Sequence, residues 1–124
     1  MRNNSKKFIF VIDDSPDNRE LLMILLEAKG FDVQCTCNGE EALSLLNELS
    51  RLPDLILLDA MMPIMDGYEF RQKQNQNLRL RTIPVVVMTG DDDIDMSKNM
   101  MQPQGIILKP LHVNSVIESV SAFL

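Results

Sequence analysis

The amino-acid sequence predicts an α/β fold, in which one doubly wound sheet of five parallel strands carries helices on both faces. Two observations lead to this prediction. Five short apolar segments alternate with longer segments of helical periodicity, which is the pattern of consecutive β-α-β units. Several apolar segments, among them residues 55–58, are continuous rather than alternating, as expected for strands buried on both faces. Right-handed crossovers then place helices on both sides of the sheet and create a switch point in the strand order.

The first strand and the first helix have clear boundary signals. Residues 6–12 predict a buried strand that ends at two acids, Asp13 and Asp14. The Ser-Pro pair at positions 15–16 offers an N-cap and a proline at the first helical position, and Gly30 closes the helix. We therefore expect the acidic pair to lie where the strand passes into the helix.

The middle of the chain continues the alternation. Residues 31–37 alternate in polarity and include β-branched side chains, which predicts a more exposed strand. Asn38 and Glu41 form a plausible capping pair for the second helix. Residues 55–58 then predict a buried strand that delivers one carboxylate, Asp59, before a loop with proline and glycine.

The remaining elements follow in the same order. We expect a polar helix with a thin apolar side at residues 68–77, followed by a buried strand at 83–88 that ends at Thr89. A short helix at 94–101 and a strand at 106–108 that ends at Lys109 come next. The last element is an amphipathic helix at 113–123, with His112 or Asn114 near its cap. Most methionines of this region are expected to lie in the core or to fill gaps in it: Met61, Met62, Met65, Met88, Met96, Met100 and Met101.

Four of the five strands end in polar residues of chemical use, namely Asp13 with Asp14, Asp59, Thr89 and Lys109. Each alone would be ordinary, as a turn residue, a cap or a solvated lysine. In a parallel sheet, however, all carboxyl ends lie on one edge, where ligands bind in open α/β sheets. Their co-occurrence at successive strand ends therefore predicts one shared functional pocket.

The residue types in this pocket suit phosphoryl transfer onto a carboxylate. Three neighbouring carboxylates cannot all stay ionised without compensation, and Mg²⁺ would supply it through oxygen ligands. Lys109 adds a positive charge, while Thr89 and nearby loop N–H groups can orient phosphoryl oxygens. Asp59, alone at the end of the central strand, is the natural nucleophile.

Length and composition exclude several other classes. At 124 residues the chain is expected to form one domain, residues 1–124, with residues 1–6 flexible. No apolar run approaches the ~18 residues of a membrane span, so we expect no membrane insertion. A net charge of −6 disfavours direct nucleic-acid binding. Two closely spaced cysteines and no signal-peptide pattern predict a cytoplasmic protein.

With these motifs in place, the whole chain resembles a receiver domain, the phospho-accepting module of two-component response regulators. The resemblance rests on Asp13 and Asp14 after the first strand, Asp59 within residues 57–67, Thr89 after the fourth strand, and Lys109 with Pro110 after the fifth. It implies a flavodoxin-like fold with strand order 2-1-3-4-5. It also implies a cis bond before Pro110.

The resemblance further implies how the site works. Asp59 would take a phosphoryl group from a phosphohistidine on a sensor histidine kinase or a histidine phosphotransfer protein. Asp14, Asp59 and the backbone carbonyl of Met61 would bind Mg²⁺, with Asp13 acting mainly through water. Thr89 and Lys109 would bind phosphoryl oxygens. Such a protein catalyses only its own phosphorylation and dephosphorylation, and it switches a surface that an unidentified output protein reads.

The chain departs from the family pattern at the readout. Members that switch through an aromatic on the last strand carry it three residues before the lysine, where this chain has Ile106. The fourth helix is expected to be shortened or mobile, and Asp91 adds a negative charge that would tune phosphoryl lifetime. Two alternatives stay open: a scaffold that binds partners without phosphorylation, and a small aspartyl-phosphate phosphatase. Against the phosphatase, Met61 stands where haloacid-dehalogenase-like enzymes carry a general acid.

Overall fold

The computed structural model describes residues 6–90 and 94–124. Its five strands form one parallel sheet in the order β2-β1-β3-β4-β5, which confirms the predicted fold class. The strands are β1 (Phe8–Ile12), β2 (Asp32–Thr36), β3 (Leu55–Asp59), β4 (Val85–Thr89) and β5 (Gly105–Leu108). The helices are α1 (Pro16–Ala28), α2 (Gly39–Glu48), α3 (Gly67–Asn75), α4 (Ile94–Met96), the π-helical turn η2 (Ser97–Met101) and α5 (Val113–Phe123). The predictions for residues 1–5, for Asp91 and for the side chains of Met96 and Met100 fall outside the described part.

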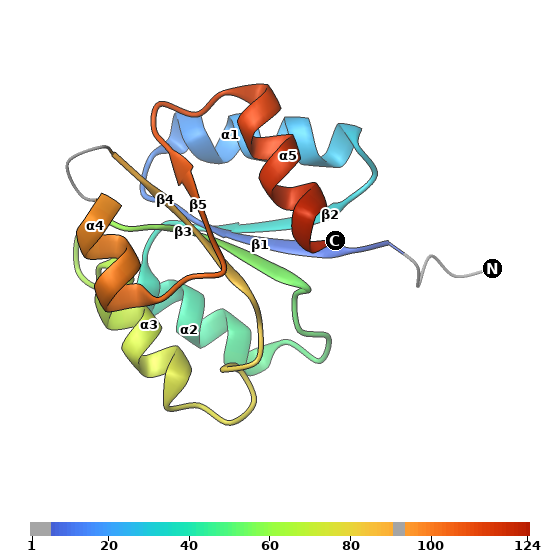
Figure 1. The fold of residues 1–124 in the computed structure, drawn as a ribbon. Coiled ribbons are helices and arrows are strands. Elements are labelled where there is room, and N and C mark those ends of the chain that lie inside the picture. The colour runs from blue at the N-terminus through green and yellow to red at the C-terminus, as the bar shows by residue number, and fades with distance from the viewer. Residues whose placement is uncertain (1–5, 91–93) are drawn as a thin grey trace.

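The helices form two layers, one on each face of the sheet. Helices α1 and α5 cover one face, and α2, α3 and α4 cover the other (Figure 1). All five residues of β1, β3 and β4 are buried, while β2 at the edge is half-buried, as the sequence predicts. Within the described residues, none of these helices combines the length and the apolarity that a membrane crossing needs.

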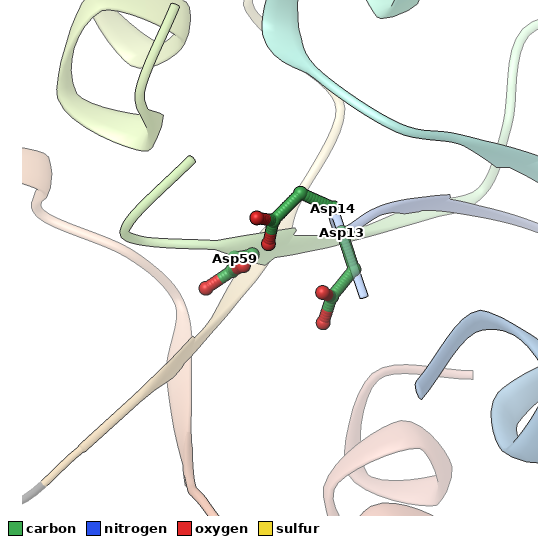
Figure 2. Close-up of side chains that lie close together, drawn as sticks. All are labelled: Asp13, Asp14 and Asp59. Carbon is green, nitrogen blue, oxygen red and sulfur yellow. The ribbon is translucent and has the colours of Figure 1, made fainter. Parts of the chain in front are cut away.

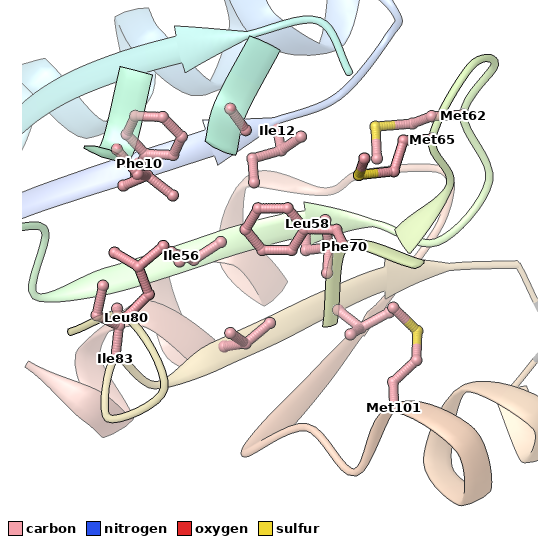
Figure 3. Packing of buried hydrophobic residues seen from close by; sticks show 14 of the residues in the cluster. Phe10, Ile12, Ile56, Leu58, Met62, Met65, Phe70, Leu80, Ile83 and Met101 are labelled. Atoms are coloured by element: carbon pink, nitrogen blue, oxygen red, sulfur yellow. The ribbon is translucent and has the colours of Figure 1, made fainter. Parts of the chain in front are cut away.

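Alternate side chains of the central strands build two separate cores. One contains Phe10, Ile56 and Leu58 from the sheet together with Phe70 of α3 (Figure 3). The other combines the opposite sides of the same strands with buried leucines of α1 and buried valines of α5. Burial on both sides explains why these strands read as continuous apolar runs.

Local capping signals fix the starts of the first two helices. The side chain of Ser15 accepts a hydrogen bond from the N–H of Asn18 and caps α1. The side chain of Asn38 accepts from the N–H of Glu41, whose carboxylate in turn accepts from the N–H of Cys37. This is a reciprocal cap close to the predicted one. His112 occupies the N-cap position of α5 but forms no side-chain capping bond.

Helix α3 is polar with a thin apolar side, as predicted, but two of its polar side chains are packed inside the protein. Arg71 and Gln74 have exposed fractions of 6% and 0%. The guanidinium of Arg71 donates to the side chain of Gln74 at 2.8 Å, and Gln74 donates to the carbonyls of Leu80 and Ile83. These bonds satisfy backbone groups of the connection to β4, so a sequence rule that counts only apolar positions underestimates how deeply this helix is packed.

The segment before β5 is short and irregular, as expected from the sequence. Three α-helical residues, Ile94–Met96, pass directly into the π-helical turn η2. Gln102 follows with φ of 47°, a left-handed conformation that is uncommon for residues other than glycine. Met61 is an exception among the methionines, most of which are expected to lie in the core. Met61 is not core but lies 57% exposed, because the chain leaves the sheet at Asp59 and Met61 stands in the loop above it.

Candidate functional site

Strand register brings the predicted site residues to one edge of the sheet. Ile12 pairs with Leu58, so the residues that follow them, Asp13 and Asp59, are neighbours. At the other side, the N–H of Lys109 donates to the carbonyl of Thr89 at 2.8 Å. Residues far apart in the chain therefore meet where β1, β3, β4 and β5 end.

Asp13 is held rigidly by the start of α1. Its carboxylate accepts from the N–H of Ser15 at 2.9 Å and from the side-chain amide of Asn18 at 3.3 Å. Arg19 donates to its backbone carbonyl at 2.7 Å. Asp13 is fully buried, whereas Asp14, the next residue, is exposed. The two acids thus present one fixed carboxylate and one at the solvent side.

Lys109 reaches back over the edge of the sheet to both buried acids. Its ammonium Nζ lies 2.9 Å from Oδ1 of Asp59 and 3.5 Å from Oδ2 of Asp13. Burial alone would lower the pKa of Lys109, but its hydrogen bond to Asp59 and the two carboxylate charges outweigh burial and raise the pKa. Lys109 is therefore a fixed positive charge beside Asp59 rather than a solvated lysine.

The carboxyl group of Asp59 has a raised pKa. Burial raises its pKa to about 7, and the charge of Asp13 adds to this, although the hydrogen bond from Lys109 acts in the opposite direction. Its Oδ1 accepts from Lys109 and, at 3.3 Å, from the N–H of Met61. Its Oδ2 is buried and has no hydrogen-bond partner among the described residues. A buried orphan oxygen is unfavourable, so this atom is poised to form a new bond.

The same three acids could hold a divalent cation. Asp13, Asp14 and Asp59 each offer an oxygen, and these oxygens lie within 4.8 Å of one another at the ends of β1 and β3 (Figure 2). The orphan Oδ2 of Asp59 and an all-oxygen donor set fit a hard cation such as Mg²⁺. The role predicted for the carbonyl of Met61 stays a prediction, since the contact shown for Met61 is that of its N–H.

Thr89 is the last of the predicted site residues at this edge of the sheet. It contacts Ser97, a residue that the sequence did not reveal. The hydroxyl of Thr89 is buried and points to the carbonyl of Gly90 at 3.5 Å. It also accepts a hydrogen bond of 3.3 Å from the hydroxyl of Ser97, a fully buried residue of η2. No motif marks this serine in the sequence, because its partner lies eight residues away in the chain.

Comparison with known proteins identifies the family of this chain. The family model of the response regulator receiver domain matches residues 9–121. The polar-differentiation response regulator DivK of Brucella anthropi is 32% identical over 123 residues, covering 95% of this chain and 96% of DivK. The transcriptional regulator RpaA of Synechocystis is 33% identical over 118 residues, and the match covers 94% of this chain but 48% of RpaA.

Solved structures are similar over nearly the whole chain. The signal receiver domain of a signal transduction histidine kinase from Syntrophus aciditrophicus has a TM-score of 0.84 at 34% identity, covering 95% of this chain and 89% of that domain. The chemotaxis response regulator CheY4 of Vibrio cholerae has a TM-score of 0.86 at 21% identity, covering 96% of this chain and 99% of CheY4, which extends the likeness of fold. From strand order, strand-end acids, lysine and family match together, the chain belongs to the response regulator receiver domains of two-component systems.

Proposed function

We propose that the protein accepts a phosphoryl group on Asp59 from a phosphohistidine, in a reaction that depends on Mg²⁺. The observation that carries the proposal is the burial and the hydrogen bonding of Asp59. Asp59 is 3% exposed, one oxygen of its carboxylate is paired with Lys109, and the other oxygen has no partner within the described chain. A reactive carboxylate with one free oxygen and a fixed cation beside it is what a phosphoacceptor needs.

The transfer would break the bond between phosphorus and the donor's imidazole nitrogen and form a bond between phosphorus and a carboxylate oxygen of Asp59. The imidazole leaves with the electron pair of the broken bond. Lys109 would neutralise charge on the phosphoryl oxygens, and the hydroxyl of Thr89 would donate to one of them. A bound Mg²⁺, held by Asp14, Asp59 and the carbonyl of Met61 with Asp13 acting mainly through water, would supply further charge neutralisation.

The protein would act on itself rather than on external substrates. A phosphatase that works through an aspartyl-phosphate needs a general acid near the leaving group. The residue two positions after Asp59 is Met61, whose side chain is apolar and 57% exposed. We therefore expect self-phosphorylation and self-dephosphorylation but no steady turnover of p-nitrophenyl phosphate.

The proposed partners follow from this chemistry. The donor would be a sensor histidine kinase or a histidine phosphotransfer protein, and the phosphorylated surface would be read by an output protein. The family match supports both classes of partner. The proposal includes a cytoplasmic location, which the two free cysteines fit, since thiols persist in reducing compartments.

Phosphorylation by acetyl phosphate tests the proposal. With Mg²⁺, the intact mass of the wild-type protein should rise by one phosphoryl group, and chelation of the metal should prevent this. Asp59→Asn should abolish labelling, while Asp17→Asn, an exposed acid of the first turn of α1, should leave it intact. Labelling that persists on another residue in Asp59→Asn would refute the assignment.

A scaffold that works without phosphorylation remains the second candidate, because Ile106 stands where a switching aromatic is found in some relatives. Beryllofluoride, which mimics a phosphoryl group on a carboxylate, separates the two readings. Equal affinity for a captured partner with and without beryllofluoride and Mg²⁺ would favour the scaffold.

A further inference from the structure

The hydroxyl of Ser97 is an unusual neighbour for the proposed phosphoryl site. Ser97 is fully buried, and it donates a hydrogen bond of 3.3 Å to the hydroxyl of Thr89. Thr89 in turn directs its own hydrogen to the carbonyl of Gly90 at 3.5 Å, which is a long hydrogen bond. The proton of Thr89 is thus weakly engaged, whereas its oxygen is tied to η2.

The far end of η2 is anchored to a different element. Arg71 of α3 donates to the carbonyl of Met101 at 2.9 Å and to the carbonyl of Gln102 at 2.9 Å. The same arginine is fixed by Gln74, as described above. Residues 97–101 therefore form a segment that is attached to the site at its first residue and to α3 at its last.

The backbone of this segment is not in a relaxed helical state. A π-helical turn is rare, and such turns are frequent at functional sites. It ends at Gln102, whose φ of 47° is sparsely populated by residues with a side chain. A segment in such a conformation can change its backbone geometry more readily than a regular helix of the same length.

We propose that Ser97 is a positioning residue that ties the hydroxyl of Thr89 to the turn η2, so that phosphorylation of Asp59 displaces residues 97–101. The proposal rests on the proposed function of Asp59. A phosphoryl group carries a charge of about −1.5 to −2 and strong acceptor oxygens, which compete with the distant carbonyl of Gly90 for the proton of Thr89. As Thr89 turns, Ser97 either follows it or keeps a buried hydroxyl without that partner, and the second outcome is unfavourable.

This coupling would take the place of the aromatic side chain that Ile106 lacks. Ile106 has no group that could bond to Thr89, and it lies on β5 rather than on the connection that Thr89 enters. Ser97 supplies a direct bond from the site to the short α4–η2 segment. The surface that changes would therefore be η2 and the part of α3 around Arg71, to which η2 is bound.

Amide NMR spectra with and without beryllofluoride and Mg²⁺ test the role of Ser97. In the wild-type protein, amides of residues 60–62 should shift as the adduct forms on Asp59, and amides of residues 98–101 should shift with them. In Ser97→Ala, residues 60–62 should still shift, while the response of residues 98–101 is lost. Ser97→Cys, which fills the site with a slightly larger group that donates only weakly, should behave in the same way and serves if the alanine variant does not fold. Ser115→Ala, an exposed serine of α5, should leave both responses unchanged.

A double-mutant cycle with Thr89→Val separates coupling from packing. If Ser97 acts through Thr89, adding Ser97→Ala to Thr89→Val should change the response of residues 98–101 no further. A response that survives in Ser97→Ala, or a loss of equal size in the Thr89→Val background, would overturn the proposal. Absence of any adduct in the wild-type protein would instead overturn the proposed function itself.

Discussion

Replacing Asp59 with asparagine should stabilise the metal-free protein, by an amount that depends on pH. In the folded protein the pKa of Asp59 rises from its ordinary value of 3.8 to about 7, chiefly because of burial. Between these two values the folded state binds more protons than the unfolded state, so the contribution of Asp59 to stability falls as pH rises through this window. At 1.36 kcal/mol per pKa unit, the full loss is about 4 kcal/mol above the folded pKa.

The asparagine variant should not show most of this loss of stability at high pH. Its amide is neutral at every pH, and its oxygen can still accept the hydrogen bond from Lys109, although without the charge-assisted part. We expect Asp59→Asn to exceed the wild-type protein by about 2–4 kcal/mol in free energy of unfolding near pH 8 and to be nearly equal to it near pH 4.

Urea unfolding with a chelator present measures this difference. The midpoint should shift to higher urea in Asp59→Asn near pH 8 with an unchanged m-value, since the surface exposed on unfolding is the same. Asp17→Asn is the matched control, because Asp17 is an exposed acid. A stability difference that is the same at both pH values, or a variant less stable than the wild-type protein near pH 8, would refute the reasoning.

Four further predictions concern the site and its frame. Mg²⁺ at ten times its Kd should raise the unfolding free energy of the wild-type protein by about 1.4 kcal/mol, and no gain in calorimetry would contradict a site made of the three acids. Lys109→Met leaves two buried carboxylates without their cation and should cost about 3 kcal/mol near neutral pH by urea unfolding, as well as lowering acetyl phosphate labelling; an unchanged midpoint would argue against the ion pair. Gly67→Ala should cost about 1–3 kcal/mol, because its Cβ would meet the carbonyl oxygen of Asp59 and the methyl of Met101, each at 2.7 Å; a neutral effect would show that this contact relaxes freely. Ile64→Asn should gain about 1 kcal/mol in thermal unfolding, since Ile64 is 73% exposed with φ of 70°, a conformation that asparagine tolerates better; a loss of stability would mean that the exposed side chain packs.

The sequence predicts the sheet and the positions of the strand-end residues because both depend on local patterns. Continuous apolar segments specify strands buried on both faces, and a parallel sheet necessarily gathers their carboxyl ends. Asp59 and Lys109 could therefore be placed near each other without coordinates. The pattern could not predict that the pKa of Asp59 is raised, because this depends on burial in the folded protein. Nor could it predict that one oxygen of Asp59 lacks a hydrogen-bond partner among the described residues.

The residues that the sequence did not reveal are polar side chains in buried places. Arg71 and Gln74 look like solvated helix residues, because hydrophobic periodicity ignores hydrogen bonds to a neighbouring connection. Ser97 belongs to no sequence motif, and only the structure shows its hydrogen bond to Thr89. Met61 shows the opposite difference, because its apolar side chain is exposed in the loop after β3.

The ion pair between Lys109 and Asp59 joins residues fifty positions apart, and it has a consequence for how the chain matures. Domains fold as units during synthesis, from the N-terminus onward. Until β5 docks beside β4, the emerging polypeptide holds Asp59 without its ammonium partner, and the proposed phosphoacceptor site is incomplete. Acceptance of a phosphoryl group would therefore report that the last strand has been added, and a kinase would find no competent target in an unfinished chain.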